Sequence, residues 1–434
     1  MTAEITMLNR SAIVLAADSA VTISDSQSQI VHHSANKLFM LSKYHPVGLM
    51  IYQNTDFMGI PWETIIKLYR KKLGRKEFSQ LIDYLEDFKV FLSENRALFP
   101  EDLQKINFKE LAKGRLIYLR EKVRQEFKKE SEVRMQANNA LTAEEIKQIF
   151  TKVIEGEWLI QQNAQVLPSF SSSDKDLLIQ KYEDTFIELI RSEFQESPLD
   201  TNLQNKLREF VIYYFIRNWF VNYSGVVIAG FGKDEVFPSY VHCWVELIFE
   251  NRLKYYEYPC KTAMNQTLEF FAQSDKGTAF VTGMDPDLFN HSEKKFSEFK
   301  QKLETTIEEN ILTYIVAEKR VEAKNNLQGL INTAAKEYNE SIQNFIRDCK
   351  VAPIFRTIGN LSKDELASAA ESLVNLTSFK KRVSGELETV GGPIDVAVIS
   401  KGDGFIWIKR KHYFDPKLNQ HFLKNYYLGD ENEE

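Results

Sequence analysis

Segments with strand character and segments with helix character occupy separate blocks of this 434-residue chain. Short apolar and β-branched runs fill residues 3–52, and helical periodicity replaces them over residues 78–220. Strands return in residues 225–258, helices in 285–385, and a final hairpin in 394–408. Such segregated runs predict an α+β fold in which sheets are stacked between layers of helices.

Local sequence signals mark several ends of these elements. Pro61 stands at a first-turn position of a helix and Gly74 at its exit. Glu250 and Asn251 predict a tight turn between two strands, and the serine-rich run 169–173 predicts a loop between helices. The chain has 30 Phe and 18 Tyr but only 18 Gly and 11 Pro, a balance that favours long helices over many short loops.

Charge and cysteine content limit the partners of the chain. Lys and Arg total 55 and Asp and Glu total 61, so the formal net charge is -6 at pH 7. Because no basic excess is available to neutralise phosphates, we expect no nucleic-acid partner. Cys243, Cys260 and Cys349 are odd in number and far apart, which is typical of a reducing compartment. With no Cys-x-x-Cys or His-x-x-x-His spacing, the sequence predicts neither a metal nor another cofactor.

The hydropathy pattern argues against a membrane protein. No stretch approaches the roughly 18 apolar residues that span a bilayer. The apolar run Ala12–Ala17 is followed at once by Asp18, and no basic segment precedes it as in a secretory signal. We therefore expect a cytoplasmic protein without a membrane partner.

Thr2 follows the initiator methionine and has a side chain small enough for Met1 to be removed by methionine aminopeptidase. Removal leaves Thr2 with a free α-amine, whose unperturbed pKa of about 7.7–8.0 lets it take the hydroxyl proton near neutral pH. A neighbouring Lys⁺ lowers the pKa of this amine, and such a lysine needs an acidic partner to hold it. A threonine at position 2 carries almost no information by itself.

Three parts of the chain together resemble a proteasome β-type subunit, an N-terminal nucleophile (Ntn) hydrolase. Thr2, the run 16–22 with Asp18, and the run 36–39 with Lys37 are similar to the opening of that family. Residues 391–399, Gly-Gly-Pro-Ile-Asp-Val-Ala-Val-Ile, resemble its Gly-Gly and strand signature. Residues 271–280 resemble its glycine- and serine-rich loop near the active site.

The resemblance implies a four-layer αββα sandwich, in which two antiparallel sheets pack face to face between helix layers. Large segments without a counterpart in the family read as helical insertions into that core. We expect a discontinuous core in residues 1–98, 206–289 and 361–412, helical insertions in 99–205 and 290–360, and a C-terminal tail in 413–434.

The resemblance also implies a threonine peptidase or other amide hydrolase. Thr2 Oγ attacks the scissile carbonyl, and the Thr2 amine acts as general base. Lys37 tunes that amine, Asp18 orients Lys37, and the backbone N–H of Gln53 forms the oxyanion hole. By the same register, the substrate pocket is lined by Val21, Ala35, Ile51 and Thr55.

Several supporting positions depart from the family pattern. Gln53 stands where the family usually has glycine, and Lys276 and Val390 stand where it has supporting serines. The position at which the family has a supporting aspartate falls near Leu387 in this chain. The nucleophile, lysine and aspartate are therefore present without their usual supporting residues, a loss that lowers activity without changing a fold.

Three functions remain open at this point. The first is a peptidase with a peptide or protein substrate. The second is a catalytically inactive scaffold or partner-binding protein, like a proteasome α-type subunit. The third is an Ntn amidase for a small substrate, in which the helical insertions cover the site. We also expect a homo-oligomer or a regulatory partner bound through the helical insertions.

His32 and His33 lie in the segment before Lys37, where the family lines its specificity pocket.

Overall fold

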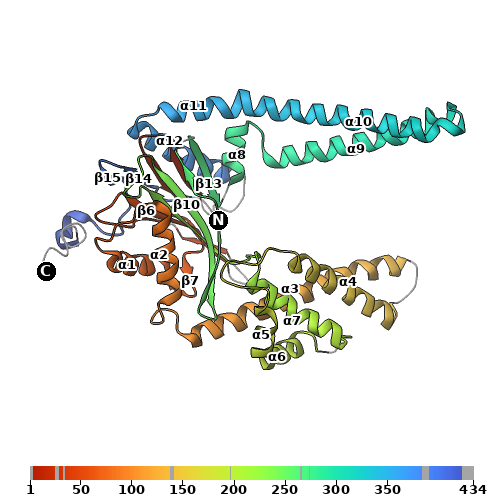
Figure 1. Cartoon of the computed structure of the whole chain (residues 1–434), viewed down its shortest axis with the longest axis horizontal. Helices are drawn as coiled ribbons and strands as arrows, with labels where there is room; N and C mark the ends of the chain where they lie inside the picture. The colour runs from red at the N-terminus through yellow and green to blue at the C-terminus, as the bar shows by residue number, and fades with distance from the viewer. Residues whose placement is uncertain are drawn as a thin grey trace.

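The computed structural model describes most of the chain, with the helices and sheets arranged as in Figure 1. The described residues are 3–24, 29–32, 35–136, 141–195, 197–263, 266–272, 274–383 and 391–422. Within them the fold is mixed, with twelve α-helices and several antiparallel sheets. The predicted order of strands, helices, strands, helices and a final hairpin is confirmed.

The first sheet combines strands from the beginning, middle and end of the chain. Its order is β13 (Thr267–Ala272), β1 (Ala3–Leu8), β2 (Ile13–Ala17), β14 (Asp395–Ser400) and β15 (Gly404–Lys409). Every neighbouring pair is antiparallel. Ala3 lies opposite Ala272, and Glu4 lies opposite Ala17. The start of β1 is thus placed beside the ends of β13 and β2.

The second sheet is also antiparallel. Its order is β11 (Arg252–Glu257), β10 (Ser239–Phe249), β9 (Ser224–Gly230), β6 (Val47–Gln53) and β5 (Leu38–Met40), with β12 (Lys261–Thr262) paired to β10. Glu250 and Asn251 have φ of 54° and 59°, as a two-residue hairpin turn requires, so the predicted turn is confirmed. Two short hairpins complete the strands: β3 (Val21–Ser24) with β4 (Gln29–His32), and β7 (Asp56–Phe57) with β8 (Ile60–Pro61).

The helices form two groups along the chain. The first comprises α1 (Trp62–Leu73), α2 (Leu81–Glu94), α3 (Glu101–Gln136), α4 (Ala143–Gln162), α5 (Asp174–Lys181), α6 (Glu183–Glu193) and α7 (Thr201–Ile216). The second comprises α8 (Ser274–Thr282), α9 (Pro286–Asn310), α10 (Ala317–Phe345), α11 (Ala352–Asn360) and α12 (Lys363–Val383). A 3₁₀-helix at Leu312–Tyr314 and a π-helix at Ile346–Val351 lie between them, and a further 3₁₀-helix at Pro416–Leu418 follows β15. In the described residues, none of these helices is both long and apolar enough to cross a membrane.

Helix ends follow the local sequence signals. Pro61 caps the N-terminus of α1, and Gly74 ends it with a φ of 52°, a left-handed conformation that glycine adopts without a steric penalty. At the start of α4, the Glu145 backbone N–H donates to Thr142 Oγ1 over 3.3 Å, while the Thr142 N–H donates to the Glu145 carboxylate over 2.9 Å. The predicted helix between Pro61 and Gly74 is confirmed.

The two faces of each sheet lie against different hydrophobic clusters. Ile13, Leu15 and Ala17 of β2 belong to a cluster between the two sheets, whereas Val14 and Ala16 belong to a cluster with helix α12. On the second sheet, the outer face packs against α1, α2, α3 and α7 in a third cluster. Because β2 is covered on both faces, its sequence reads as a continuous apolar run instead of an alternating one.

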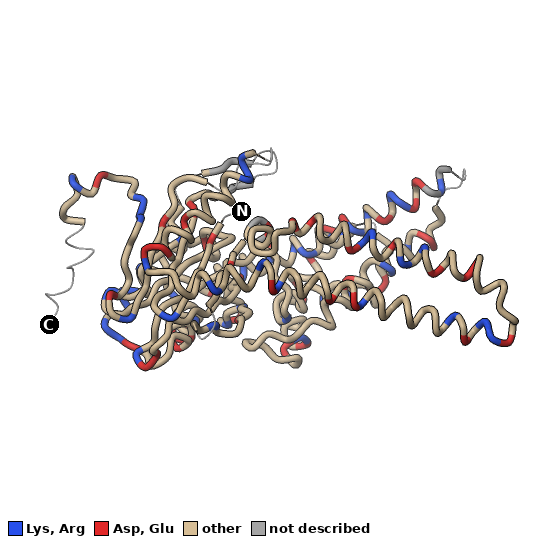
Figure 2. Tube along the Cα trace, turned by 90° about the horizontal axis from the view of Figure 1, so that it is seen from above, with Lys and Arg blue, Asp and Glu red and all other residues tan. Residues whose placement is uncertain are grey.

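The two helical regions differ in how they relate to the sheets. The rings of Phe108 in α3, Phe215 in α7 and Phe249 in β10 have centroids within 5.0 Å of one another. The helical region α3–α7 therefore shares a core with the second sheet. By contrast, α9 and α10 bury none of their described side chains and project from the body (Figure 1). Figure 2 shows acidic and basic residues distributed along the helices that project from the body.

One segment differs from its predicted form. Residues 271–280 are expected to include a glycine- and serine-rich loop, but α8 begins at Ser274 and continues to Thr282. Gly277 lies inside this helix, where a Cβ would come within 2.2 Å of the Phe270 ring. The glycine therefore permits close packing of α8 on β13, and the loop prediction is wrong.

Candidate active site

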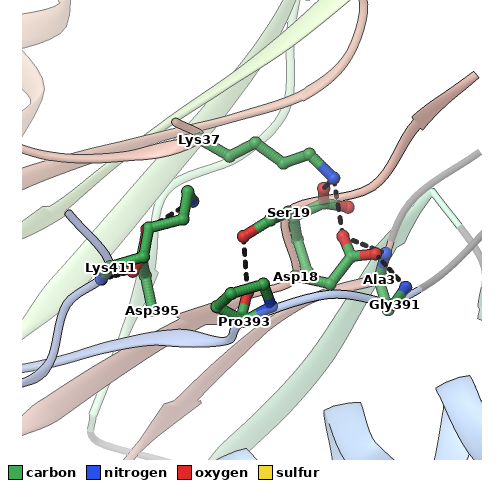
Figure 3. A network of polar contacts seen from close by, with 9 residues as sticks. Ala3, Asp18, Ser19, Lys37, Gly391, Pro393, Asp395 and Lys411 are labelled. Carbon is green, nitrogen blue, oxygen red and sulfur yellow. Dashed lines mark hydrogen bonds and ion pairs between the residues drawn. The ribbon is translucent and has the colours of Figure 1, made fainter. Parts of the chain in front are cut away.

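An ion pair links the ends of strands from different sheets. Asp18 follows β2 of the first sheet, and Lys37 precedes β5 of the second. Lys37 Nζ lies 2.6 Å from Asp18 Oδ1, and the two side chains are 2% and 0% exposed. The structure thus brings together these two predicted residues in a water-excluded position between the sheets (Figure 3).

The Asp18 carboxylate also fixes the backbone around it. Its Oδ1 accepts from the Ala3 backbone N–H over 3.2 Å, and its Oδ2 accepts from the Gly391 N–H over 2.9 Å. The Asp18 N–H in turn donates to the Ala3 carbonyl over 3.1 Å. Asp18 therefore holds the start of β1 and the segment before β14 next to Lys37. Thr2, one residue earlier, lies outside the described residues.

Glu4 is a second carboxylate beside Lys37, and the sequence reasoning missed it. Its Oε1 lies 3.3 Å from Lys37 Nζ, and its side chain is fully buried. Ala3 and Ile5, its neighbours on β1, belong to the cluster on the helix-covered face of the first sheet. A glutamate inside an otherwise apolar strand is the signal that could have found this residue, because a buried carboxylate needs a cationic partner.

The segment before β14 lies along Asp18 and Ser19. The Ser19 N–H donates to the Gly391 carbonyl over 3.2 Å, and Ser19 Oγ donates to the Pro393 carbonyl. Gly392, between them, has a φ of 77°, which favours glycine and explains part of the Gly-Gly motif. The Gly-Gly segment thus lies directly against Asp18 and Ser19.

A second buried ion pair lies next to the first (Figure 3). Lys411 Nζ is 2.8 Å from Asp395 Oδ2, and the Lys411 N–H donates to Asp395 Oδ1 over 2.7 Å. Burial lowers the pKa of Lys411 against the opposing effect of Asp395, and the positive charge of Lys37 lowers it further. The site therefore carries three buried carboxylates and two lysines: Glu4, Asp18, Asp395, Lys37 and Lys411.

Gln53 has a backbone conformation that glycine adopts more readily than other residues. It ends β6, its side chain is exposed, and its φ of 75° lies in the left-handed region that favours glycine. A glutamine in this conformation stores about 1 kcal/mol or more of backbone strain, as residues at functional sites often do.

The expected pocket residues do not all lie in comparable surroundings. Val21, Ala35 and Thr55 are partly exposed, and the Ala35 N–H donates to the Ser19 carbonyl over 3.2 Å. Ile51 is only 1% exposed and packs in the cluster on the helix-covered face of the second sheet. The place of these four residues in a substrate pocket stays a prediction.

Other predicted positions contribute little to this geometry. His32 is exposed at the end of β4. His33, Leu387 and Val390 lie outside the described residues, as does the side chain of Lys276. In the described part of the chain, no group of three or more His, Cys, Asp or Glu side chains is placed to hold a metal ion.

A partly buried aromatic group next to Gln53 was also missed. Trp244 Nε1 donates to Tyr52 Oη over 2.9 Å, and Tyr52 Oη lies 2.6 Å from His242 Nε2. His242 also stacks on Tyr258, with the ring centroids 4.2 Å apart. Burial lowers the pKa of His242 to about 4, and the charge of Lys261 adds to this, so the imidazole is neutral at pH 7. In the sequence these residues look like ordinary strand interior.

Comparisons with known proteins leave the family of this chain open. No protein-family model and no curated protein matches it. One similar solved structure is Anbu (ancestral beta-subunit) from Yersinia bercovieri, with 9% sequence identity over 98% of this chain and 94% of that chain. The TM-score is 0.28, which is too low to support an argument about fold or function.

We predict that Lys37→Met destabilises the protein by about 3–5 kcal/mol, because it leaves Glu4 and Asp18 buried without their shared cation. Adding Glu4→Gln to this variant should recover part of the loss by removing one of the two charges. Denaturant unfolding measures both effects. Lys336→Met on α10, where the lysine is 77% exposed, is the matched control and should change stability by less than about 0.5 kcal/mol. Equal stability of Lys37→Met and the control would contradict this account.

The His242 environment predicts a pH-dependent stability. The unfolded protein takes up a proton at this residue near pH 6.5 and the folded protein only near about 4, so the unfolded state binds more protons in between. The free energy of unfolding should therefore fall by up to about 3 kcal/mol as the pH drops through this window. His242→Gln, whose side chain can still accept a hydrogen bond from Tyr52, should lose this pH dependence of the free energy of unfolding. Denaturant titrations at pH 7, 5.5 and 4.5 measure it. The same slope in both proteins would rule out His242 as its source.

Proposed function

We propose that this chain is an Ntn hydrolase that cleaves amide bonds with Thr2 after removal of Met1. The observation that carries the proposal is the buried Lys37–Asp18 ion pair, with Asp18 hydrogen-bonded to Ala3, the residue after Thr2. The chemistry requires a lysine held by an acid beside an N-terminal threonine, and this chain has such a lysine where β1 begins.

The proposed reaction has two stages. In the first, Thr2 Oγ attacks the substrate carbonyl carbon while the Thr2 amine takes the hydroxyl proton. The oxyanion accepts a hydrogen bond from the Gln53 N–H, and the amine then returns its proton to the leaving nitrogen as the carbon–nitrogen bond breaks. In the second, the amine takes a proton from water, and the resulting hydroxide cleaves the ester to release the acid and restore Thr2.

One lysine and two buried carboxylates lie close to Ala3 and Glu4, the residues after Thr2. In the proposed mechanism the positive charge of Lys37 keeps the Thr2 amine free to accept a proton, whereas the negative charge of Glu4 acts in the opposite direction. Asp18 keeps Lys37 in place through the ion pair and two backbone hydrogen bonds. In the proposed mechanism Glu4 and Asp18 thus set how strongly Lys37 acts.

The energetics of burial favour an enzyme over an inactive scaffold. Removing two carboxylates and a lysine from water is costly, and well-packed apolar residues often stabilise a fold as well as a buried ion pair does. The left-handed Gln53 adds strain at the same end of the second sheet. The proposed hydrolase uses both features, because the ion pair holds Lys37 in place and the Gln53 N–H contacts the oxyanion.

The proposal includes an architecture and a set of partners. We assign the αββα sandwich to residues 1–98, 206–289 and 361–412, and helical insertions to 99–205 and 290–360. The two facing sheets with helices on their outer faces support this assignment. We also propose a peptide or protein substrate and a cytoplasmic location. The helical insertions would bind a second copy of the chain or a regulatory partner.

An epoxyketone or boronate probe tests the nucleophile. We predict a covalent adduct on the chain that begins at Thr2, its loss in Thr2→Ala, and its retention in Thr333→Ala, a matched change on the projecting helix α10. Intact mass and peptide mapping locate the adduct. An adduct that persists in Thr2→Ala would identify another nucleophile, and no adduct on a chain with an exposed Thr2 would favour the scaffold.

A further inference from the structure

A cavity of about 220 Å³ opens beside the proposed active site. Asn36, which directly precedes Lys37, lines it, and so does Pro393, whose carbonyl accepts from Ser19 Oγ. Lys411, the partner of Asp395, lines it as well. The cavity therefore shares its wall with the segments that hold Asp18 and Lys37, and none of the four expected pocket residues lines it.

The charges around this cavity are mainly positive. Lys67, Arg410 and Lys411 line it, and Glu63 is the one acidic group among its described lining residues. Asp395 offsets the charge of Lys411, so three cations stand against two carboxylates. Glu63 is already engaged, because Lys67 Nζ lies 2.5 Å from its Oε1 and Asn36 donates to its Oε2 over 3.0 Å. Burial raises the pKa of Glu63, but these two bonds outweigh it and keep the carboxylate ionised. An anionic group of a ligand thus meets a net positive surface.

The outer wall of the cavity is aromatic. His412, Tyr413, Phe414 and Phe422 line it. The Phe414 and Phe422 ring centroids lie 4.8 Å apart, and the Tyr413 ring is 98% exposed. A ligand with an apolar or aromatic body beside its anionic group would match both walls at once, since such rings bury apolar surface with little loss of freedom.

We propose that this cavity binds the carboxylate of the substrate, so that the preferred substrates are short amides with a free carboxylate next to an apolar or aromatic side chain. That the ligand is a substrate rests on the proposed function. Binding to the cavity does not, because it depends on Lys67, Glu63 and Arg410 and not on Thr2. This proposal narrows the peptide or protein substrate proposed above to a short one, as in an Ntn amidase for a small substrate.

The test measures binding without catalysis. Isothermal titration of the Thr2→Ala protein with N-acetyl-alanyl-phenylalanine should show about tenfold tighter binding than with its C-terminal carboxamide, since only the first carries the charge. Equal binding of the two compounds, or no binding of either, would overturn the proposal.

Two further variants predict shifts of opposite sign. Lys67→Met should weaken carboxylate binding by about fivefold, because it removes a cation and exposes the charge of Glu63. Glu63→Gln should tighten it by about threefold, because it releases Lys67. Both side chains are more than one-third exposed, so neither change threatens the fold. Lys336→Met is the control and should leave both affinities unchanged. Shifts of the same sign would contradict the assignment.

The outcomes separate this proposal from the one on which it rests. If the Thr2 probe gives no adduct but the carboxylate still binds selectively, the hydrolase is rejected and the cavity assignment stands. If Thr2 reacts but carboxylate and carboxamide bind alike, the cavity assignment alone is rejected.

Discussion

The ion pair between Asp18 and Lys37 is the constraint on which the proposed site depends. It joins the end of a strand in one sheet to the beginning of a strand in the other, with both side chains out of contact with water. Its burial is costly unless every remaining hydrogen-bonding position is satisfied. Backbone N–H groups of Ala3 and Gly391 supply that satisfaction, so the same carboxylate fixes the start of β1 and the segment before β14.

The sequence was sufficient for those elements that local physics determines. The strands around Leu15 and Ile228 are buried on both faces and therefore appear as short apolar runs, and Gly74 ends its helix by a conformation that other residues avoid. The Asp18–Lys37 pair was predictable only through the resemblance, because nothing in the spacing of 19 residues places two side chains together. Local patterns describe elements, whereas contacts across sheets depend on the whole fold.

The errors have the same origin. Glu4 went unnoticed because a single charge in a strand gains meaning only when Lys37 is seen beside it. The segment after Ala272 was read as a loop from its glycine, which instead allows a helix to approach Phe270. In each case tertiary packing decided what the residue does.

The proposed mechanism requires a free amine on Thr2, since a nitrogen in a peptide bond to Met1 cannot accept a proton. Intact mass spectrometry of the protein purified from its native cells tests this requirement directly. We predict a mass lower than that of the full sequence by one methionine residue. Retention of Met1 on the purified protein would contradict the N-terminal nucleophile mechanism and leave the buried ion pair with a structural role alone.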